Sequence, residues 1–153
     1  MNDSLRPIVL VEDDPKDAEL ALNALAEYHV ANRVRHLRDG AEALEYLYRR
    51  GQFAGNSDSP PAVILLDLKM PKMDGVEVLR QIKSEPQLKT IPVVIMTSSR
   101  EDRDLERCYE LGANSYVVKP VKFHEFVEAV KQLGVYWAAL NEPPPSAARA
   151  ESE

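Results

Sequence analysis

The chain has 153 residues, of which 44% are hydrophobic and 29% charged, so it fits one globular domain with a full core rather than a disordered chain. Its formal net charge of −6 argues against a nucleic-acid-binding surface, and its single cysteine excludes an intrachain disulfide. Because the sequence holds neither an apolar run of membrane-spanning length nor a signal-peptide pattern, we expect a cytoplasmic protein that does not bind a membrane.

Short apolar runs alternate with helical patterns along the chain. The apolar runs predict strands at residues 7–11, 32–37, 62–66, 91–96 and 116–118. The helical patterns predict helices at residues 15–26, 40–47, 76–85, 101–111 and 123–137. Residues 51–61 are rich in Gly, Ser and Pro and predict a long loop, whereas residues 141–153 predict a flexible C-terminal tail.

This alternation predicts an α/β fold, a doubly wound five-stranded parallel sheet with helices on both faces. Charged side chains interrupt residues 32–37, which favours an edge position for that strand. The expected strand order is therefore 2-1-3-4-5, the flavodoxin-like form. In such a sheet the residues that follow the strands collect at one edge, where proteins of this class bind their ligands.

Polar side chains stand at the carboxyl ends of four predicted strands. In chain order they are Glu12 and Asp13, Asp67, Thr97 and Lys119. The first and third strands are neighbours in the expected order, about 4.8 Å apart, so the three carboxylates should meet. Oxygen ligands without His or Cys suit Mg²⁺, which would also relieve their mutual repulsion. We expect Asp13 and Asp67 to bind Mg²⁺ by their side chains, with a backbone carbonyl near Lys69 and with Glu12 through a water molecule.

A carboxylate in such a site can also attack phosphorus and form an acyl phosphate. Asp67 is the best-placed acceptor, because the central strand sets it between the acidic pair and the two donors. The Thr97 hydroxyl and the Lys119 ammonium would then stabilise the oxygens of the transferred phosphoryl group.

Four motifs at these strand ends resemble the receiver domain of bacterial response regulators, in order and in spacing. They are Val11-Glu12-Asp13-Asp14-Pro15, Leu66-Asp67-Leu68-Lys69-Met70-Pro71 with Asp74-Gly75, Thr97-Ser98-Ser99, and Tyr116-Val117-Val118-Lys119-Pro120. The resemblance covers residues 7–133. It predicts a receiver domain at residues 1–140, with an extended last helix, ahead of the tail at 141–153.

The resemblance implies that a sensor histidine kinase donates a phosphoryl group to Asp67 in a Mg²⁺-dependent reaction. It implies that Lys119, held by a cis bond to Pro120, pairs with that group. Thr97 and Tyr116 would be the switch residues, changing the surface formed by the helix at 101–111, the strand at 116–118 and the last helix.

A narrower resemblance is to single-domain regulators paired with phytochromes. It rests on the Val-Glu-Asp-Asp-Pro-Lys-Asp-Ala-Glu start, the long loop at 51–61 and the extended last helix with Trp137. It implies a phytochrome as the kinase. It also implies a homodimer, formed either through the surface of the helix at 101–111, the strand at 116–118 and the last helix, or through the C-terminal extension.

Three other functions fit a site of this kind less well. A Mg²⁺-dependent phosphatase with an aspartyl nucleophile needs a second acid two residues later, where this chain has Lys69. A flavin or nucleotide binder would meet the repulsive acids Glu12 and Asp13 in its first loop. A non-phosphorylated interaction module would not need the complete set of acids, Thr97 and Lys119. We therefore expect a phosphoacceptor signalling domain rather than an enzyme.

Overall fold

The computed structural model of the protein describes residues 6–27, 34–98 and 103–131. The strands are β1 (Ile8–Val11), β2 (Val34–Leu37), β3 (Val63–Asp67), β4 (Val93–Thr97) and β5 (Ser115–Val118). The helices are α1 (Pro15–Glu27), α2 (Gly40–Tyr48), α3 (Gly75–Ser84), α4 (Arg103–Leu111) and α5 (Phe123–Lys131), with a short 3₁₀ helix η2 (Gly51–Phe53). None of the described helices is both long enough and apolar enough to cross a bilayer.

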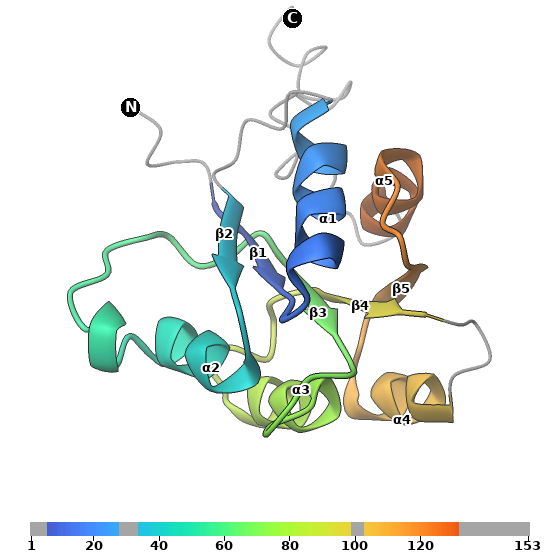
Figure 1. The fold of residues 1–153 in the computed structure, drawn as a ribbon. Helices are drawn as coiled ribbons and strands as arrows, with labels where there is room; N and C mark the ends of the chain where they lie inside the picture. The colour runs from blue at the N-terminus through green and yellow to red at the C-terminus, as the bar shows by residue number, and fades with distance from the viewer. Residues whose placement is uncertain (1–5, 28–33, 99–102, 132–153) are drawn as a thin grey trace, which may run out of the picture.

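The strands form one parallel sheet in the order β2-β1-β3-β4-β5, which confirms the predicted fold class and topology. Helices α1 and α5 cover one face of the sheet, and α2, α3 and α4 cover the other (Figure 1). All strands point the same way, so their carboxyl ends lie along one edge of the sheet.

Each central strand is apolar on both faces because helices cover both sides. Val9 and Ile64 belong to the core under α2, α3 and α4, whereas their neighbours Leu10 and Leu65 belong to the core under α1 and α5. β2 differs, since only Leu37 is fully buried there. This agrees with the predicted edge position of β2.

Aspartate caps start the helices next to the sheet edge. Asp14 Oδ1 accepts hydrogen bonds from the backbone N–H groups of Lys16, at 2.8 Å, and Asp17, at 3.2 Å. Asp74 accepts one from Glu77 N at 3.0 Å. Each cap satisfies N–H groups that the first turn of a helix cannot pair internally. The caps fix where α1 and α3 begin relative to β1 and β3.

Gly75 allows the loop after β3 to fold back onto the strand. A Cβ at this position would lie 2.2 Å from the backbone oxygen of Asp67, a distance no side chain can occupy. The backbone N–H of Gly75 donates to the Leu68 carbonyl at 2.9 Å. The glycine therefore lets α3 begin directly against the end of β3.

Some element boundaries differ from the sequence prediction. β4 begins at Val93 rather than at residue 91, because Pro92 has no N–H to give to the sheet. The loop at 51–61 opens with η2, which was not predicted. The predicted strand residues 32–33, the predicted helical residues 101–102 and 132–137, and the predicted tail at 141–153 lie outside the described residues.

Candidate functional site

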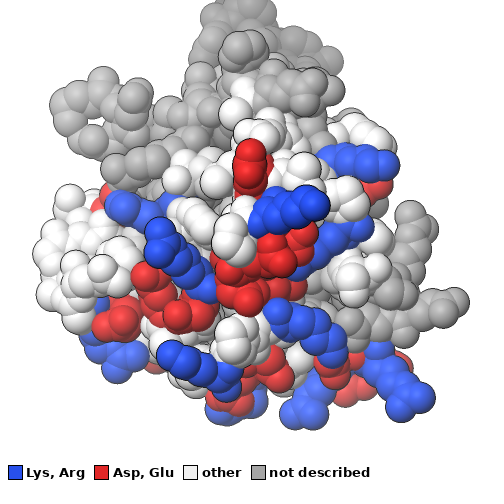
Figure 2. All heavy atoms as spheres, in the orientation of Figure 1, with Lys and Arg blue, Asp and Glu red and all other residues white. Residues whose placement is uncertain are grey.

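The residues predicted to form the site meet at the carboxyl edge of the sheet. Carboxylate oxygens of Glu12, Asp13 and Asp67 all lie within 4.8 Å of one another. Together with Thr97 and Lys119 they line an open pocket of about 240 Å³. Figure 2 shows acidic side chains gathered at the centre of this face, with lysine and arginine side chains around them. The fold thus brings together the acids, the hydroxyl and the ammonium that the sequence pointed to.

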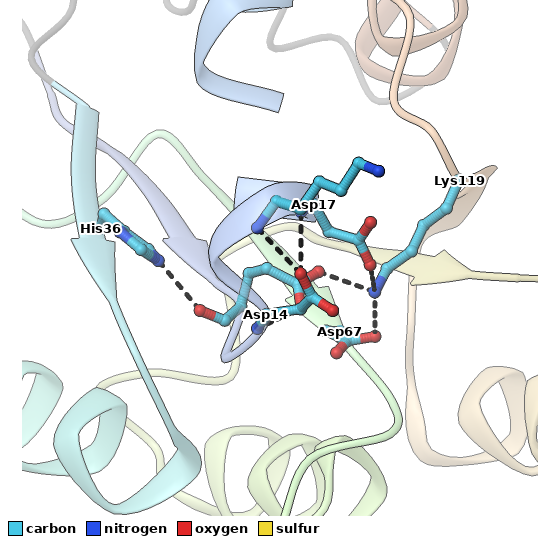
Figure 3. Close-up of polar contacts among 7 residues, drawn as sticks. Asp14, Asp17, His36, Asp67 and Lys119 are labelled. Atoms are coloured by element: carbon cyan, nitrogen blue, oxygen red, sulfur yellow. Dashed lines mark hydrogen bonds and ion pairs between the residues drawn. The ribbon is translucent and has the colours of Figure 1, made fainter. Parts of the chain in front are cut away.

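Lys119 reaches into the acidic group from the end of β5. Its Nζ lies 2.7 Å from Glu12 Oε1, 2.9 Å from Asp67 Oδ1 and 3.1 Å from Asp17 Oδ2 (Figure 3). The backbone N–H of Lys119 donates to the Thr97 carbonyl at 2.8 Å, and the Lys119–Pro120 peptide bond is cis, as expected. One ammonium group is therefore shared by three carboxylates.

Burial dominates the electrostatics of the two inner acids. Glu12 is 1% exposed and Asp67 is 3% exposed. Burial raises the pKa of Glu12 to about 7, even though hydrogen bonds from Lys119 and from the Asp14 backbone lower it. Burial likewise raises the pKa of Asp67 above its usual value, against the opposing effect of Lys119. The site thus holds more buried negative charge than its lysine neutralises.

Two opposing effects act on the pKa of Lys119. Burial disfavours its ammonium form, but hydrogen bonds to Glu12 and Asp67 more than offset this and raise the pKa of Lys119 above its usual value. Lys119 therefore carries its positive charge throughout the physiological pH range.

The three clustered acids fit a hard divalent cation. All of the donors in the cluster are carboxylate oxygens, which such ions prefer. Asp13 is the more solvent-accessible member, so an ion could reach the cluster with part of its water shell. A cation here would also favour the charged forms of Glu12 and Asp67, against the burial that raises their pKa values.

Lys69 and Ser98 also line the pocket. The Lys69 side chain is mostly exposed, and Lys69 Nζ forms an ion pair with Asp104 Oδ2 on α4 at 3.0 Å. Thr97 is buried at the end of β4, and Ser98 beside it is exposed. Small polar side chains at this wall leave space in the pocket next to Asp67.

Tyr116 does not line this pocket. It lies on β5, half-buried, and its ring meets that of Tyr109 on α4 edge to face, with centroids 6.4 Å apart. Both rings line a second hollow of about 420 Å³ between α4, β5 and α5. Tyr116 is thus placed in the surface that the sequence prediction described as a switch.

Two contacts were not predicted. Asp17 contacts Lys119, and the only signal for this in the sequence is the place of Asp17 in the first turn of the helix that follows Glu12 and Asp13. His36 on β2 is half-buried, and its Nε2 lies 2.9 Å from the backbone oxygen of Glu12. That contact depends on the register in which β2 pairs with β1, which the sequence pattern does not reveal.

Residues 8–131 match the family model of the response regulator receiver domain. The chain is 42% identical over 137 residues to the probable methanogenesis regulatory protein FilR2 of Methanothrix harundinacea, covering 90% of this chain and 86% of FilR2. It is 38% identical over 141 residues to the response regulator Rcp1 of Synechocystis, covering 90% of this chain and 94% of Rcp1.

Solved structures of response regulators are also similar to this chain. The bacteriophytochrome response regulator AtBRR has 56% identity and a TM-score of 0.83, over 90% of this chain and 99% of AtBRR. The phosphorylated cyanobacterial phytochrome response regulator RcpA has 40% identity and a TM-score of 0.71, over 92% and 98%. The Mn²⁺-bound form of Rcp1 has 34% identity and a TM-score of 0.71, over 91% and 97%. The predicted resemblance to phytochrome-paired regulators is therefore confirmed, and the chain belongs to the response regulator receiver domain family.

Proposed function

We propose that this protein is a response regulator that accepts a phosphoryl group on Asp67 from a sensor histidine kinase. The observation that carries the proposal is the buried carboxylate of Asp67, with Lys119 Nζ 2.9 Å away and two further acids within reach of a shared cation. The phosphorylated form of the related regulator RcpA supports it. The similarity to AtBRR supports a phytochrome as the kinase.

Asp13 and Asp67 would hold Mg²⁺ by their side chains, Glu12 through a water molecule, and the loop near Lys69 by a backbone carbonyl. When bound, the ion would neutralise charge that develops on the phosphoryl oxygens. The Mn²⁺-bound form of Rcp1 supports a divalent cation in this family. The all-carboxylate cluster of this chain favours a hard ion such as Mg²⁺.

In the transfer step, a carboxylate oxygen of Asp67 attacks the phosphorus of phosphohistidine. The phosphorus–nitrogen bond breaks, its electron pair stays on the imidazole nitrogen, and that nitrogen takes up a proton. Asp67 becomes an acyl phosphate, and the Lys119 ammonium and the Thr97 hydroxyl donate to the phosphoryl oxygens. Attack of water on phosphorus later releases inorganic phosphate and restores the carboxylate.

The output surface would be the face made by α4, β5 and α5. The backbone N–H of Lys119 donates to the Thr97 carbonyl, so a shift of the Thr97 backbone would reach the end of β5, three residues after Tyr116. Partner proteins, or a second copy of the chain, would bind there or through the C-terminal extension. The proposed partners are proteins in the cytoplasm, and not nucleic acid or a membrane.

A phosphatase with an aspartyl nucleophile is the alternative. It would need an acid two residues after Asp67 to protonate the leaving group. That position holds Lys69, which pairs with Asp104. The arrangement therefore favours a phosphoryl group that persists on Asp67 over rapid turnover of esters.

Acetyl phosphate with Mg²⁺ tests the proposal. Intact-mass spectrometry should show one phosphoryl group added to the wild type and none to Asp67→Asn. Asp74→Asn is the matched control, because it makes the same change at a helix cap outside the pocket and should leave labelling intact. Labelling of the Asp67→Asn variant, or rapid turnover of small phosphate esters by the wild type, would contradict the assignment.

A further inference from the structure

Asp17 is a further carboxylate beside the site, and neither the predicted residue set nor the metal cluster includes it. It lies in the first turn of α1, with Oδ2 3.1 Å from Lys119 Nζ. Figure 3 shows Lys119 reaching between Asp17 on one side and Asp67 on the other. The side chain of Asp17 is 35% exposed, so it forms the outer wall of the pocket rather than its floor.

The three carboxylates around Lys119 differ in what the reaction requires of them. An ammonium group has three N–H donors, and here three carboxylates lie within contact distance of it. Glu12 and Asp67 belong to the cluster that would hold a cation. Asp67 is also the proposed acceptor, and it loses its negative charge when it becomes an acyl phosphate. Asp17 has neither task, so its charge stays available to Lys119 throughout.

We propose that Asp17 is a positioning residue that keeps the Lys119 ammonium at the site while Asp67 accepts the phosphoryl group. This inference rests on the proposed function. As the Asp67 carboxylate loses its charge, one N–H of Lys119 passes from Asp67 Oδ1 to a phosphoryl oxygen. The N–H held by Asp17 stays engaged, so the ammonium pivots over a short distance instead of leaving toward water.

The local structure suits Asp17 to this task. Its backbone N–H donates to the Asp14 cap at 3.2 Å, which fixes the first turn of α1. The next residue, Ala18, is buried, as are Ala21 and Leu25 further along the helix, so α1 is held against the sheet. The carboxylate of Asp17 therefore stands on a rigid element, as a group that positions another must.

Kinetics of labelling by acetyl phosphate test the proposal. Asp17→Asn removes the charge but keeps the shape, and we expect about tenfold slower labelling at saturating donor, with the half-saturating donor concentration unchanged. Glu19→Gln is the control, because it removes one charge from an exposed position on the same helix, and it should label like the wild type. Asp17→Glu should recover part of the rate.

A double-mutant cycle separates positioning from a general structural effect. If Asp17 acts through Lys119, Asp17→Asn should have no further effect in a Lys119→Met background. A second readout needs no phosphodonor. In the metal-free protein the side-chain ¹H–¹⁵N signal of the Lys119 ammonium should broaden in Asp17→Asn, because its protons exchange faster with water, and should stay sharp in Glu19→Gln.

Three results would contradict the role of Asp17 or the proposed function. A wild type that labels on Asp67, while Asp17→Asn labels as fast as Glu19→Gln, would overturn the role of Asp17 and leave the proposed function standing. Equal slowing by Asp17→Asn with and without Lys119 would also overturn it, because the effect would then not pass through Lys119. A wild type that takes up no phosphoryl group would overturn the proposed function itself, and this inference with it.

Discussion

Lys119 and Lys69 line the same pocket, and each has a carboxylate oxygen within about 3 Å, but their surroundings differ. The Lys119 side chain is 16% exposed, and its partner Glu12 is 1% exposed. The Lys69 side chain is 67% exposed, and its partner Asp104 is 42% exposed. The two pairs are thus alike in length and opposite in burial.

The comparison shows that the length of an ion pair does not set its importance. Around Lys119 little water screens the charges, and the removal of one partner leaves buried carboxylates without compensation. Around Lys69, water solvates both charges whether or not they touch, so such a pair contributes about 0–1 kcal/mol. The buried ion pairs of Lys119 should therefore control both stability and chemistry, and the exposed Lys69–Asp104 pair should control neither strongly.

Removal of Lys119 should have the largest effect. Lys119→Met should slow labelling by acetyl phosphate about 100-fold, because a donor to the phosphoryl oxygens is lost. At pH 8 it should also lower the free energy of unfolding by about 3 kcal/mol, because Glu12 and Asp67 stay buried without their cation. Labelling kinetics and urea unfolding measure the two effects. Equal losses in Lys69→Met would contradict the distinction between the two lysines.

The next largest effect should be the pH dependence of the free energy of unfolding, which the buried acids cause. Burial raises the pKa of Glu12 from 4.5 to about 7 and shifts the pKa of Asp67 in the same direction. Between pH 4.5 and about 7, Glu12 of the folded protein keeps a proton that Glu12 of the unfolded chain has released. Since the unfolded state then binds fewer protons, the free energy of unfolding falls as pH rises toward 7 and stays low above it. We expect a loss of about 1–3 kcal/mol from Glu12.

Urea unfolding in EDTA at a series of pH values measures the slope of the free energy of unfolding against pH. Glu12→Gln should flatten it and leave the protein more stable than the wild type at pH 8. An unchanged slope in that variant would show that Glu12 does not titrate as its burial requires.

Loss of the Lys69–Asp104 pair should have the smallest effect. Lys69→Met and Asp104→Asn should each change the free energy of unfolding by about 0.5 kcal/mol or less. The coupling energy between the two, from a double-mutant cycle, should shrink further in high salt, because exposed charges are screened. A coupling of several kcal/mol would mean that exposure is a poor guide to the value of these pairs.

The positions of the main site residues could be predicted from local sequence patterns. Asp67, Thr97 and Lys119 each lie at the end of an apolar run, and parallel strands bring such ends to one edge whatever the details of packing. Asp14 and Asp74 could be predicted as caps because a cap depends only on the next few residues.

Contacts that depend on register and side-chain conformation could not be predicted in the same way. Asp17 and Lys119 are 102 residues apart, and their contact needs both the placement of α1 and the reach of a long side chain from β5. His36 contacts the backbone oxygen of Glu12 only because β2 pairs with β1 in one particular register. Periodicity identifies faces and ends of elements, but it does not fix how one element slides along another.

Gly75 has a consequence for how mutations in this protein should be interpreted. It carries no functional group and touches no substrate, but a methyl group there would collide with the backbone of Asp67. In a scan of all substitutions scored by phosphoryl uptake, residue 75 should therefore behave as if it were catalytic. Its intolerance would measure how little room the acceptor's own backbone has, and a ranking of sites by mutational sensitivity alone would mistake this steric requirement for chemistry.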